Sequence, residues 1–165
     1  MKYTKREYTP AELRDKAAAY CSTAEHCLQE VREKLRQWGC ERDEQAILDY
    51  LVDEGFVSHP RYAQAFVHDK LLYQHWGRRK LQTMLAAKKI ERSIIAEAMN
   101  TINETEYHQV LTDVAKKKIA TLRGDNLAHD KYLRFMLGRG FEFREAETVL
   151  AELKINLGET TGSDY

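Results

Sequence analysis

The chain has 165 residues, 43% of them hydrophobic and 32% charged, and its 26 basic and 26 acidic side chains give a formal net charge of zero. This much apolar material can form a core, which excludes a wholly disordered chain. Eight glycines and two prolines supply too few turns for a sandwich or barrel of many short strands, so we expect an all-α protein. Because the whole chain is neutral, any affinity for nucleic acid must come from local basic patches.

No part of the sequence is suited to crossing a membrane. The longest uninterrupted apolar run, from Ala17 to Cys21, has five residues, whereas a spanning helix needs roughly 18 or more. Residues 1–9 are polar and lack the apolar stretch of a secretory signal. We therefore expect a cytoplasmic protein.

Helical periodicity begins at a capping box. In Thr9-Pro10-Ala11-Glu12, threonine and glutamate can satisfy each other's backbone N–H groups, and proline suits the first helical position. Apolar residues then recur at helical spacing, and glycines mark helix ends. In chain order, the predicted helices are 10–25, 28–38, 43–54, one capped by Ser58 with Tyr62, Phe66 and Tyr73, one with Leu81 and Leu85, 91–102, one with Val110, Leu111 and Val114, one around Tyr132 and Met136, and 142–156.

The helical pattern occurs three times. Equivalent positions recur at offsets of 50 and then 51 residues, which is typical of a repeat array, although chance similarity among amphipathic helices is the alternative. The matched positions are Val31/Leu81/Tyr132, Leu35/Leu85/Met136, Gly39/Lys89/Gly140 and Cys40/Ile90/Phe141. We predict a tandem array of three three-helix modules, elongated and curved. Its expected bounds are 10–55, 56–103 and 104–157, with flexible ends at 1–9 and 158–165.

The neutral total conceals a basic middle. The formal net charges are −3 for residues 1–58, +5 for 59–102, +2 for 103–141 and −4 for 142–165. A purely solvated surface has no need of such an asymmetry, so the middle is the expected contact surface, and the second module is its basic centre.

Within this basic middle, Trp76-Gly77-Arg78-Arg79-Lys80 lies at a turn between helices and Lys88-Lys89 lies at a helix end. The cations could neutralise phosphates, and Trp76 could stack on a base. Alternatively, the lysines only complement a helix dipole and Trp76 belongs to the core. Lys70 interrupts an apolar helical face, so its side chain must extend to water or meet an anionic partner.

Motifs of enzymes are missing. The sequence has no phosphate-binding glycine loop, no H-E-x-x-H and no G-x-S-x-G, so we expect a protein that is not an enzyme. A zinc site built from Cys21, His26, Cys27 and Cys40 is conceivable, but no C-x2-4-C pair anchors it. We therefore expect free thiols and neither a metal nor another cofactor.

The order of several motifs resembles the RecX family, whose members bind the bacterial recombinase RecA and control its filament on single-stranded DNA. The similarity covers roughly residues 10–155. It rests on Glu30-Val31-x-x-Lys34-Leu35-x-x-x-Gly39, Gly55-Phe56-Val57, Arg61-Tyr62-Ala63, Phe66-Val67, Gly77-Arg78-Arg79-Lys80-Leu81 and Arg134-Phe135-Met136-Leu137-x-Arg139-Gly140-Phe141. The chain departs from the family pattern at Cys27 (usually serine or threonine), at Ser58-His59-Pro60 (usually an acidic pair) and at Lys88-Lys89 (usually Lys-Gly).

This resemblance implies a cytoplasmic, non-catalytic regulator, which we expect to be a monomer. It would insert along the groove of the RecA filament or block its growing end, and so inhibit ATP hydrolysis, strand exchange and repressor cleavage in DNA repair and recombination. Weak direct binding to DNA is possible, and no membrane is involved. The residues implied in partner or DNA binding are Arg61, Lys70, Trp76, Arg78, Arg79, Lys80, Lys88, Lys89, Arg134 and Arg139.

Two other functions are left open by the residues themselves. Three-helix units can present a recognition helix to the major groove, so a direct, sequence-selective duplex-DNA-binding protein is the main alternative. A metal-dependent nuclease is the other.

Overall fold

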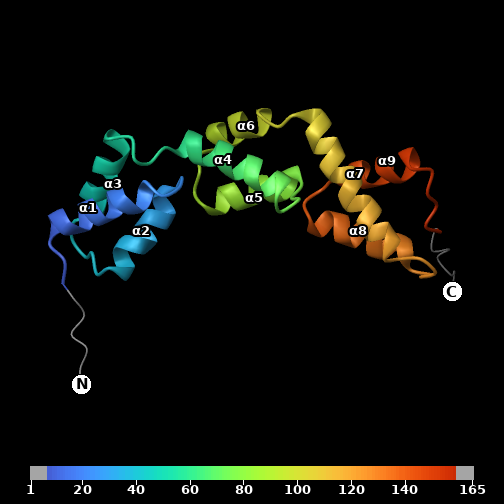
Figure 1. The fold of residues 1–165 in the computed structure, drawn as a ribbon, viewed down its shortest axis with the longest axis horizontal. Helices are drawn as coiled ribbons and strands as arrows, with labels where there is room; N and C mark the ends of the chain where they lie inside the picture. The colour runs from blue at the N-terminus through green and yellow to red at the C-terminus, as the bar shows by residue number, and fades with distance from the viewer. Residues whose placement is uncertain (1–6, 159–165) are drawn as a thin grey trace, which may run out of the picture. The chain divides into compact units, whose positions relative to one another are not determined.

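The computed structural model describes residues 7–158, and this part of the chain contains nine α-helices and no strand (Figure 1), which confirms the predicted all-α class. No helix in these residues combines the length and the apolar character that a bilayer crossing requires. The helices are α1 (Pro10–Cys21), α2 (Leu28–Gln37), α3 (Glu44–Asp53), α4 (His59–Leu72), α5 (Arg78–Ala87), α6 (Arg92–Asn100), α7 (Glu104–Ala120), α8 (Ala128–Gly138) and α9 (Phe143–Glu152).

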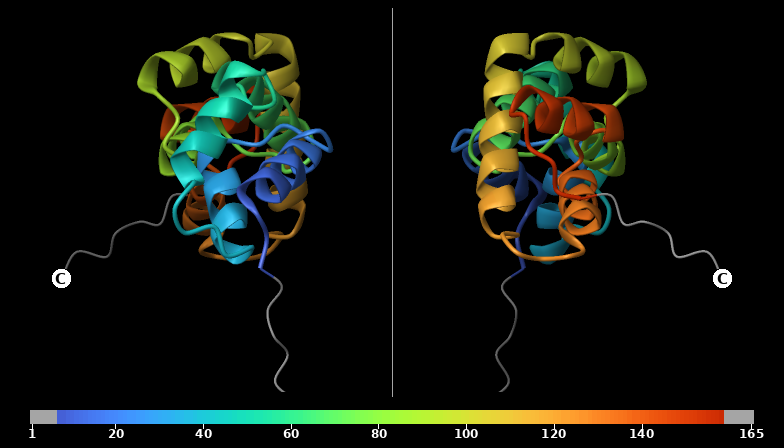
Figure 2. Two further views of the ribbon diagram at one scale, coloured as in Figure 1. Left: turned by 90° about the vertical axis from the view of Figure 1, so that its left-hand side faces the viewer. Right: turned by 90° about the vertical axis from the view of Figure 1, so that its right-hand side faces the viewer.

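The chain forms two compact units. The first runs to Ala65 and includes Leu85–Ile95, and the second comprises Phe66–Met84 and the chain from Ala96 onward. In the first unit α1, α2 and α3 pack against one another, and in the second unit α7, α8 and α9 do the same (Figure 2). The predicted module bounds 10–55, 56–103 and 104–157 and their arrangement stay predictions, and most of the predicted flexible ends, 1–9 and 158–165, lies outside the described residues.

Apolar side chains on one face of each helix form the cores. In the first unit Leu13 and Ala17 of α1, Val31 and Leu35 of α2 and Leu51 of α3 belong to one buried cluster. The largest fully buried side chains also include Tyr132 of α8 and Phe141, which follows α8, in the second unit. The phenol of Tyr132 donates a hydrogen bond to the carbonyl of Ala146 in α9 at 2.9 Å, so this polar group is satisfied inside the core.

Three helices end in the same way at the matched positions of the sequence. Gly39, Lys89 and Gly140 have φ values of 88°, 59° and 90°, in the left-handed region. The next residue donates its N–H to a carbonyl five residues earlier: Cys40 to Leu35, Ile90 to Leu85 and Phe141 to Met136, at 2.9, 3.2 and 3.1 Å. This is the hydrogen bond of a Schellman cap, which turns an apolar residue back onto the helix it has just left.

The first predicted helix is shorter than its periodicity suggested. It ends at Cys21 and not near residue 25. The hydroxyls of Ser22 and Thr23 donate to the carbonyls of Ala18 and Tyr20, at 2.8 and 2.7 Å, and so satisfy the end of the helix with side chains. The predicted capping box at its start is confirmed, because Thr9 and Glu12 each accept a hydrogen bond from the other's backbone N–H.

Two glycines let α5 begin against the end of α8 in the second unit. A β-carbon at position 77 would overlap the backbone of Gly140 and Phe141, and one at position 140 would overlap Lys80. The N–H of Gly77 donates to the carbonyl of Arg139 at 2.8 Å, and the N–H of Arg79 donates to that of Gly140 at 3.0 Å. The close approach of the two backbones is therefore what makes these hydrogen bonds possible.

We predict that Gly77→Ala destabilises the protein by about 1–3 kcal/mol, because backbone atoms cannot move aside as a flexible side chain can. Gly138→Ala is the matched control: a β-carbon there meets open space within α8, and alanine should stabilise the helix by up to about 1 kcal/mol. Urea unfolding followed by circular dichroism measures both. Equal stability of the two variants would contradict the contact.

Candidate functional site

Arg78 is held within the fold. Its guanidinium forms ion pairs with Glu104 at 2.6 Å and Glu145 at 3.4 Å, and it lies over the ring of Tyr107 at 3.8 Å from the centroid. Its backbone N–H also donates to the Tyr107 hydroxyl, at 3.3 Å. Burial, together with the nearby Glu145, raises the pKa of Tyr107, which therefore stays a protonated hydrogen-bond donor. Arg78 thus joins the start of α5 to α7 and α9.

Arg61 and Lys88, which the resemblance also pointed to, are paired with carboxylates in the first unit. Arg61 binds Glu25 at 2.9 Å and donates to the carbonyl of Gly55 at 2.8 Å. Lys88 binds Glu30 at 3.0 Å, with its side chain half-buried. These two cations are therefore already paired with carboxylates within the first unit.

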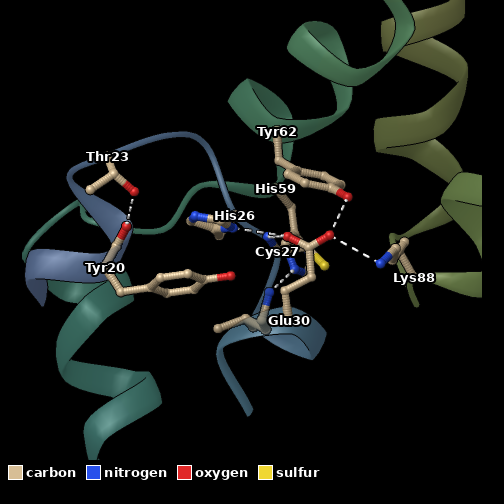
Figure 3. Close-up of polar contacts among 9 residues, drawn as sticks. Tyr20, Thr23, His26, Cys27, Glu30, His59, Tyr62 and Lys88 are labelled. Carbon is tan, nitrogen blue, oxygen red and sulfur yellow. Dashed lines mark hydrogen bonds and ion pairs between the residues drawn. The ribbon is translucent and has the colours of Figure 1, made fainter. Parts of the chain in front are cut away.

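Glu30 is the centre of a polar cluster that the sequence did not single out (Figure 3). One carboxylate oxygen accepts hydrogen bonds from the Tyr62 hydroxyl at 2.9 Å and from the Lys88 ammonium at 3.0 Å. The other lies 3.1 Å from Nδ1 of His26 and accepts from the N–H of Cys27 at 3.4 Å. Three segments far apart in the sequence thus meet at one carboxylate.

The charged form of Glu30 is stabilised in spite of partial burial. Burial alone would raise the pKa of its carboxyl, but hydrogen bonds from Lys88, Tyr62 and His26 together lower the pKa below its ordinary value. Burial and the bond to Glu30 raise the pKa of Tyr62. At neutral pH Glu30 is therefore a charged carboxylate that accepts hydrogen bonds from its neighbours.

The three departures from the family pattern lie in and beside this cluster. Cys27 precedes α2, Lys88 follows α5, and His59 begins α4. Nε2 of His59 lies 3.4 Å from the N–H of Leu28, and its Nδ1 lies 2.8 Å from a carboxylate oxygen of Glu91. These residues thus cap and connect helices of the first unit.

Two lysines and a phenylalanine lie close to the ring of Trp76, which is partly buried. Lys70 and Lys80 place their ammonium groups 5.4 and 4.6 Å from the centroid of its ring, and the edge of the ring meets Phe66 at 6.1 Å. These contacts are cation–π interactions, which are favourable where the ring is partly shielded from water. Tyr73, in contrast, is 71% exposed.

Three N–H groups at the N-terminus of α5 are already hydrogen-bonded within the fold. The N–H groups of Gly77, Arg78 and Arg79 donate to the Arg139 carbonyl, the Tyr107 hydroxyl and the Gly140 carbonyl. A helix N-terminus binds a phosphate only through N–H groups that are free. Arg139 also donates from Nη1 to the carbonyl of Gln74, at 2.8 Å, and lies over the ring of Phe135.

Four of the ten residues are exposed, and one of them, Arg61, is already paired with Glu25. The other three are Arg79, Lys89 and Arg134. Within residues 7–158 the side chains of these three residues form no ion pair and no hydrogen bond. Arg79 and Arg134 belong to the second unit and Lys89 to the first. These are the cations that can meet a partner without first breaking a contact of the fold.

Beside Arg79 lies a shallow groove, which we call the α5–α8 groove, with a volume of about 530 Å³. Its lining residues are Arg79, Lys80, Thr83, Met84, Leu137, Gly138, Gly140 and Phe141. Leu137 remains 42% exposed. The sequence placed Leu137 in the motif of residues 134–141 but did not identify it as exposed, because a leucine next to a buried residue such as Met136 looks like part of the core.

The described part of the chain offers no grouping of three histidine, cysteine or acidic side chains that could hold a metal ion. Cys21, Cys27 and Cys40 are buried free thiols. Burial raises the pKa of all three, that of Cys21 to about 11. They are therefore protonated and poorly reactive at neutral pH.

Comparison with known proteins points to one family. Residues 59–99 match the family model described as RecX, second three-helix domain. The regulatory protein RecX of Vibrio parahaemolyticus serotype O3:K6 is 25% identical over 151 residues, which cover 90% of this chain and 96% of that protein. The regulatory protein RecX of Herminiimonas arsenicoxydans is 26% identical over 139 residues, or 84% of this chain and 90% of that one.

Two solved structures have the same fold. The crystal structure of RecX from Lactobacillus salivarius superposes with a TM-score of 0.73 at 20% identity, covering 87% of this chain and 96% of that chain. A second crystal structure of a regulatory protein RecX gives a TM-score of 0.74 at 18% identity, covering 86% and 73%. At this level of identity the two structures bear on the fold alone.

The Glu30 cluster yields a prediction about pH. We expect Glu30→Gln to destabilise the protein by about 1–3 kcal/mol at pH 7, because Lys88 loses its counter-charge in a half-buried position. Since the folded-state pKa of Glu30 lies below its ordinary value of 4.5, the contribution is present above that pH and is lost as the pH falls through the lowered pKa. The gap between wild type and variant should therefore close on acidification.

Urea unfolding at neutral and acidic pH measures this gap. Glu33→Gln, at an exposed position of the same helix, is the control and should differ little from wild type at either pH. A gap for Glu30→Gln that stays constant with pH would rule out the lowered pKa as its cause.

Proposed function

Because the chain belongs to the RecX family of regulatory proteins, we propose that it binds the RecA recombinase on single-stranded DNA and inhibits the filament. Inhibition would cover ATP hydrolysis, strand exchange and coprotease activity, in DNA repair and recombination in the cytoplasm. The observation that carries the proposal is the alignment of relatives named regulatory protein RecX over as much as 90% of this chain. In this role the protein is a non-catalytic binding partner.

The contacts of the nine candidate cations support three different roles for them. Arg61, Arg78 and Lys88 are engaged by carboxylates of the fold. Lys70, Lys80 and Arg139 lie against aromatic rings. We assign to these three cations secondary contacts with a partner. Arg79, Lys89 and Arg134 are exposed and have no ion-pair partner among residues 7–158, and we assign the first electrostatic contacts with the filament to them.

Two modes of inhibition are compatible with this surface: insertion along the filament groove, and capping of its growing end. The main alternative function is direct, sequence-selective binding to duplex DNA. Such a protein would bind duplex in the absence of RecA, with an affinity that falls steeply as salt rises. The start of α5 does not favour this alternative, because three of its N–H groups are already hydrogen-bonded within the fold. Recognition helices commonly contact bases and phosphates near their N-terminal ends.

We predict that the wild-type protein suppresses the ATPase activity of RecA on single-stranded DNA, and that Arg79→Glu with Arg134→Glu raises the half-inhibiting concentration about three- to tenfold. Exposed charges of this kind act mainly on the rate of association. Arg42→Glu, at an exposed position in the acidic first third of the chain, is the control. Circular dichroism should show the same helical content for all variants.

A wild-type protein without effect on the ATPase would overturn the proposed function. Full inhibition by the double variant would leave the function standing and place the electrostatic contact elsewhere. Selective binding of a duplex without RecA would favour the alternative.

A further inference from the structure

We propose that the α5–α8 groove of the second unit binds an acidic segment of a partner protein through one aliphatic or aromatic anchor side chain. This inference rests on the proposed function only for the identity of the partner, which would be the RecA protein of the filament. The groove itself is defined by residues 79–84 and 137–141.

The apolar part of the groove comes from both helices. Leu137 lies in the last turn of α8 and keeps 42% of its surface exposed, whereas its neighbour Met136 is fully buried. Met84, which is partly buried, lines the same groove from α5. An exposed leucine beside a hollow is suited to receive a second apolar side chain, because both then lose contact with water.

The polar part of the groove is positive. Arg79 is exposed and has no carboxylate partner among the described residues. Lys80 has its ammonium over the Trp76 ring, likewise with no acidic partner in that part of the chain. No acidic residue is among those that line the groove. A segment with carboxylates on either side of an apolar residue therefore complements both features.

The chemistry of the groove favours a protein over a nucleic acid. Single-stranded nucleic acid is held by aromatic faces and by phosphate contacts. Phe141, the aromatic residue that lines the groove, is fully buried, and the ring of Trp76 already has cation–π contacts with Lys70 and Lys80. The N–H groups at the start of α5 are already used. What the groove leaves accessible is aliphatic carbon beside cations.

The walls of the groove are fixed before a partner arrives. The backbone hydrogen bonds of Gly77 to Arg139 and of Arg79 to Gly140 connect the start of α5 to the end of α8. A binding surface that is ordered in the free protein loses little conformational entropy on association. A short peptide segment can therefore bind measurably despite the small area.

The first test uses the intact 165-residue chain and needs no RecA. The probe is a short fluorescent peptide of glutamate with leucines at helical spacing, followed by fluorescence anisotropy. We expect binding to wild type, about tenfold weaker binding to Leu137→Glu, and a comparable loss when serine replaces the leucines of the peptide. Leu127→Glu is the matched control, because Leu127 lies at the other end of α8 and is 47% exposed.

Absence of peptide binding, or equal binding by the two leucine variants, would overturn the proposal. So would a single-stranded oligonucleotide that competes with the peptide and loses affinity in Leu137→Glu, because the groove would then belong to nucleic acid. Circular dichroism of both variants checks that the helices are intact.

The second test separates the groove from the proposed function. We expect Leu137→Glu to raise the concentration that half-inhibits the RecA ATPase about tenfold, and Leu127→Glu to leave it unchanged. If wild type binds the peptide but does not inhibit RecA, the proposed function fails and the groove stands. If wild type inhibits and Leu137→Glu inhibits equally, the proposed function stands and the groove is not the contact.

Discussion

The second unit depends on the direct contact of two stretches of backbone. Gly77 and Gly140 have no side chains, and for this reason the first N–H groups of α5 reach carbonyls at the end of α8. This contact satisfies the start of one helix with the end of another, a function that a capping side chain or water would otherwise perform. It also affects the chemistry nearby, because it occupies N–H groups at the start of α5 that could otherwise bind an anion.

A second constraint operates in the first unit, where Glu30 connects helices. A partly buried carboxylate is costly unless hydrogen bonds and a counter-charge compensate its lost hydration. Tyr62 supplies a hydrogen bond and Lys88 supplies the counter-charge, each from a segment of the chain outside α2. The cations of the chain therefore divide into two classes. Some, such as Lys88 and Arg78, belong to the internal structure, and others, such as Arg79, are available to a partner.

The helices could be predicted from the sequence because their apolar residues recur at the helical period, and the repeat was visible because the cores use equivalent positions. The end of α1 was predicted too late, since the side chains of Ser22 and Thr23 end that helix without a glycine. The roles of Arg78 and Arg79 could not be separated in advance. The two are adjacent in the sequence, and the partners that distinguish them, Glu104 and Glu145, are 26 and 67 residues away from Arg78.

Lys89 occupies the left-handed position at which the equivalent helices have Gly39 and Gly140. A side chain with a β-carbon costs roughly 1–2 kcal/mol in that conformation, so the end of α5 carries strain that the other two helix ends avoid. The same geometry directs a charged side chain away from the helix and into solvent. Compared with α2 and α8, α5 is thus less stable at its end, but it exposes there a positive charge that glycine could not provide.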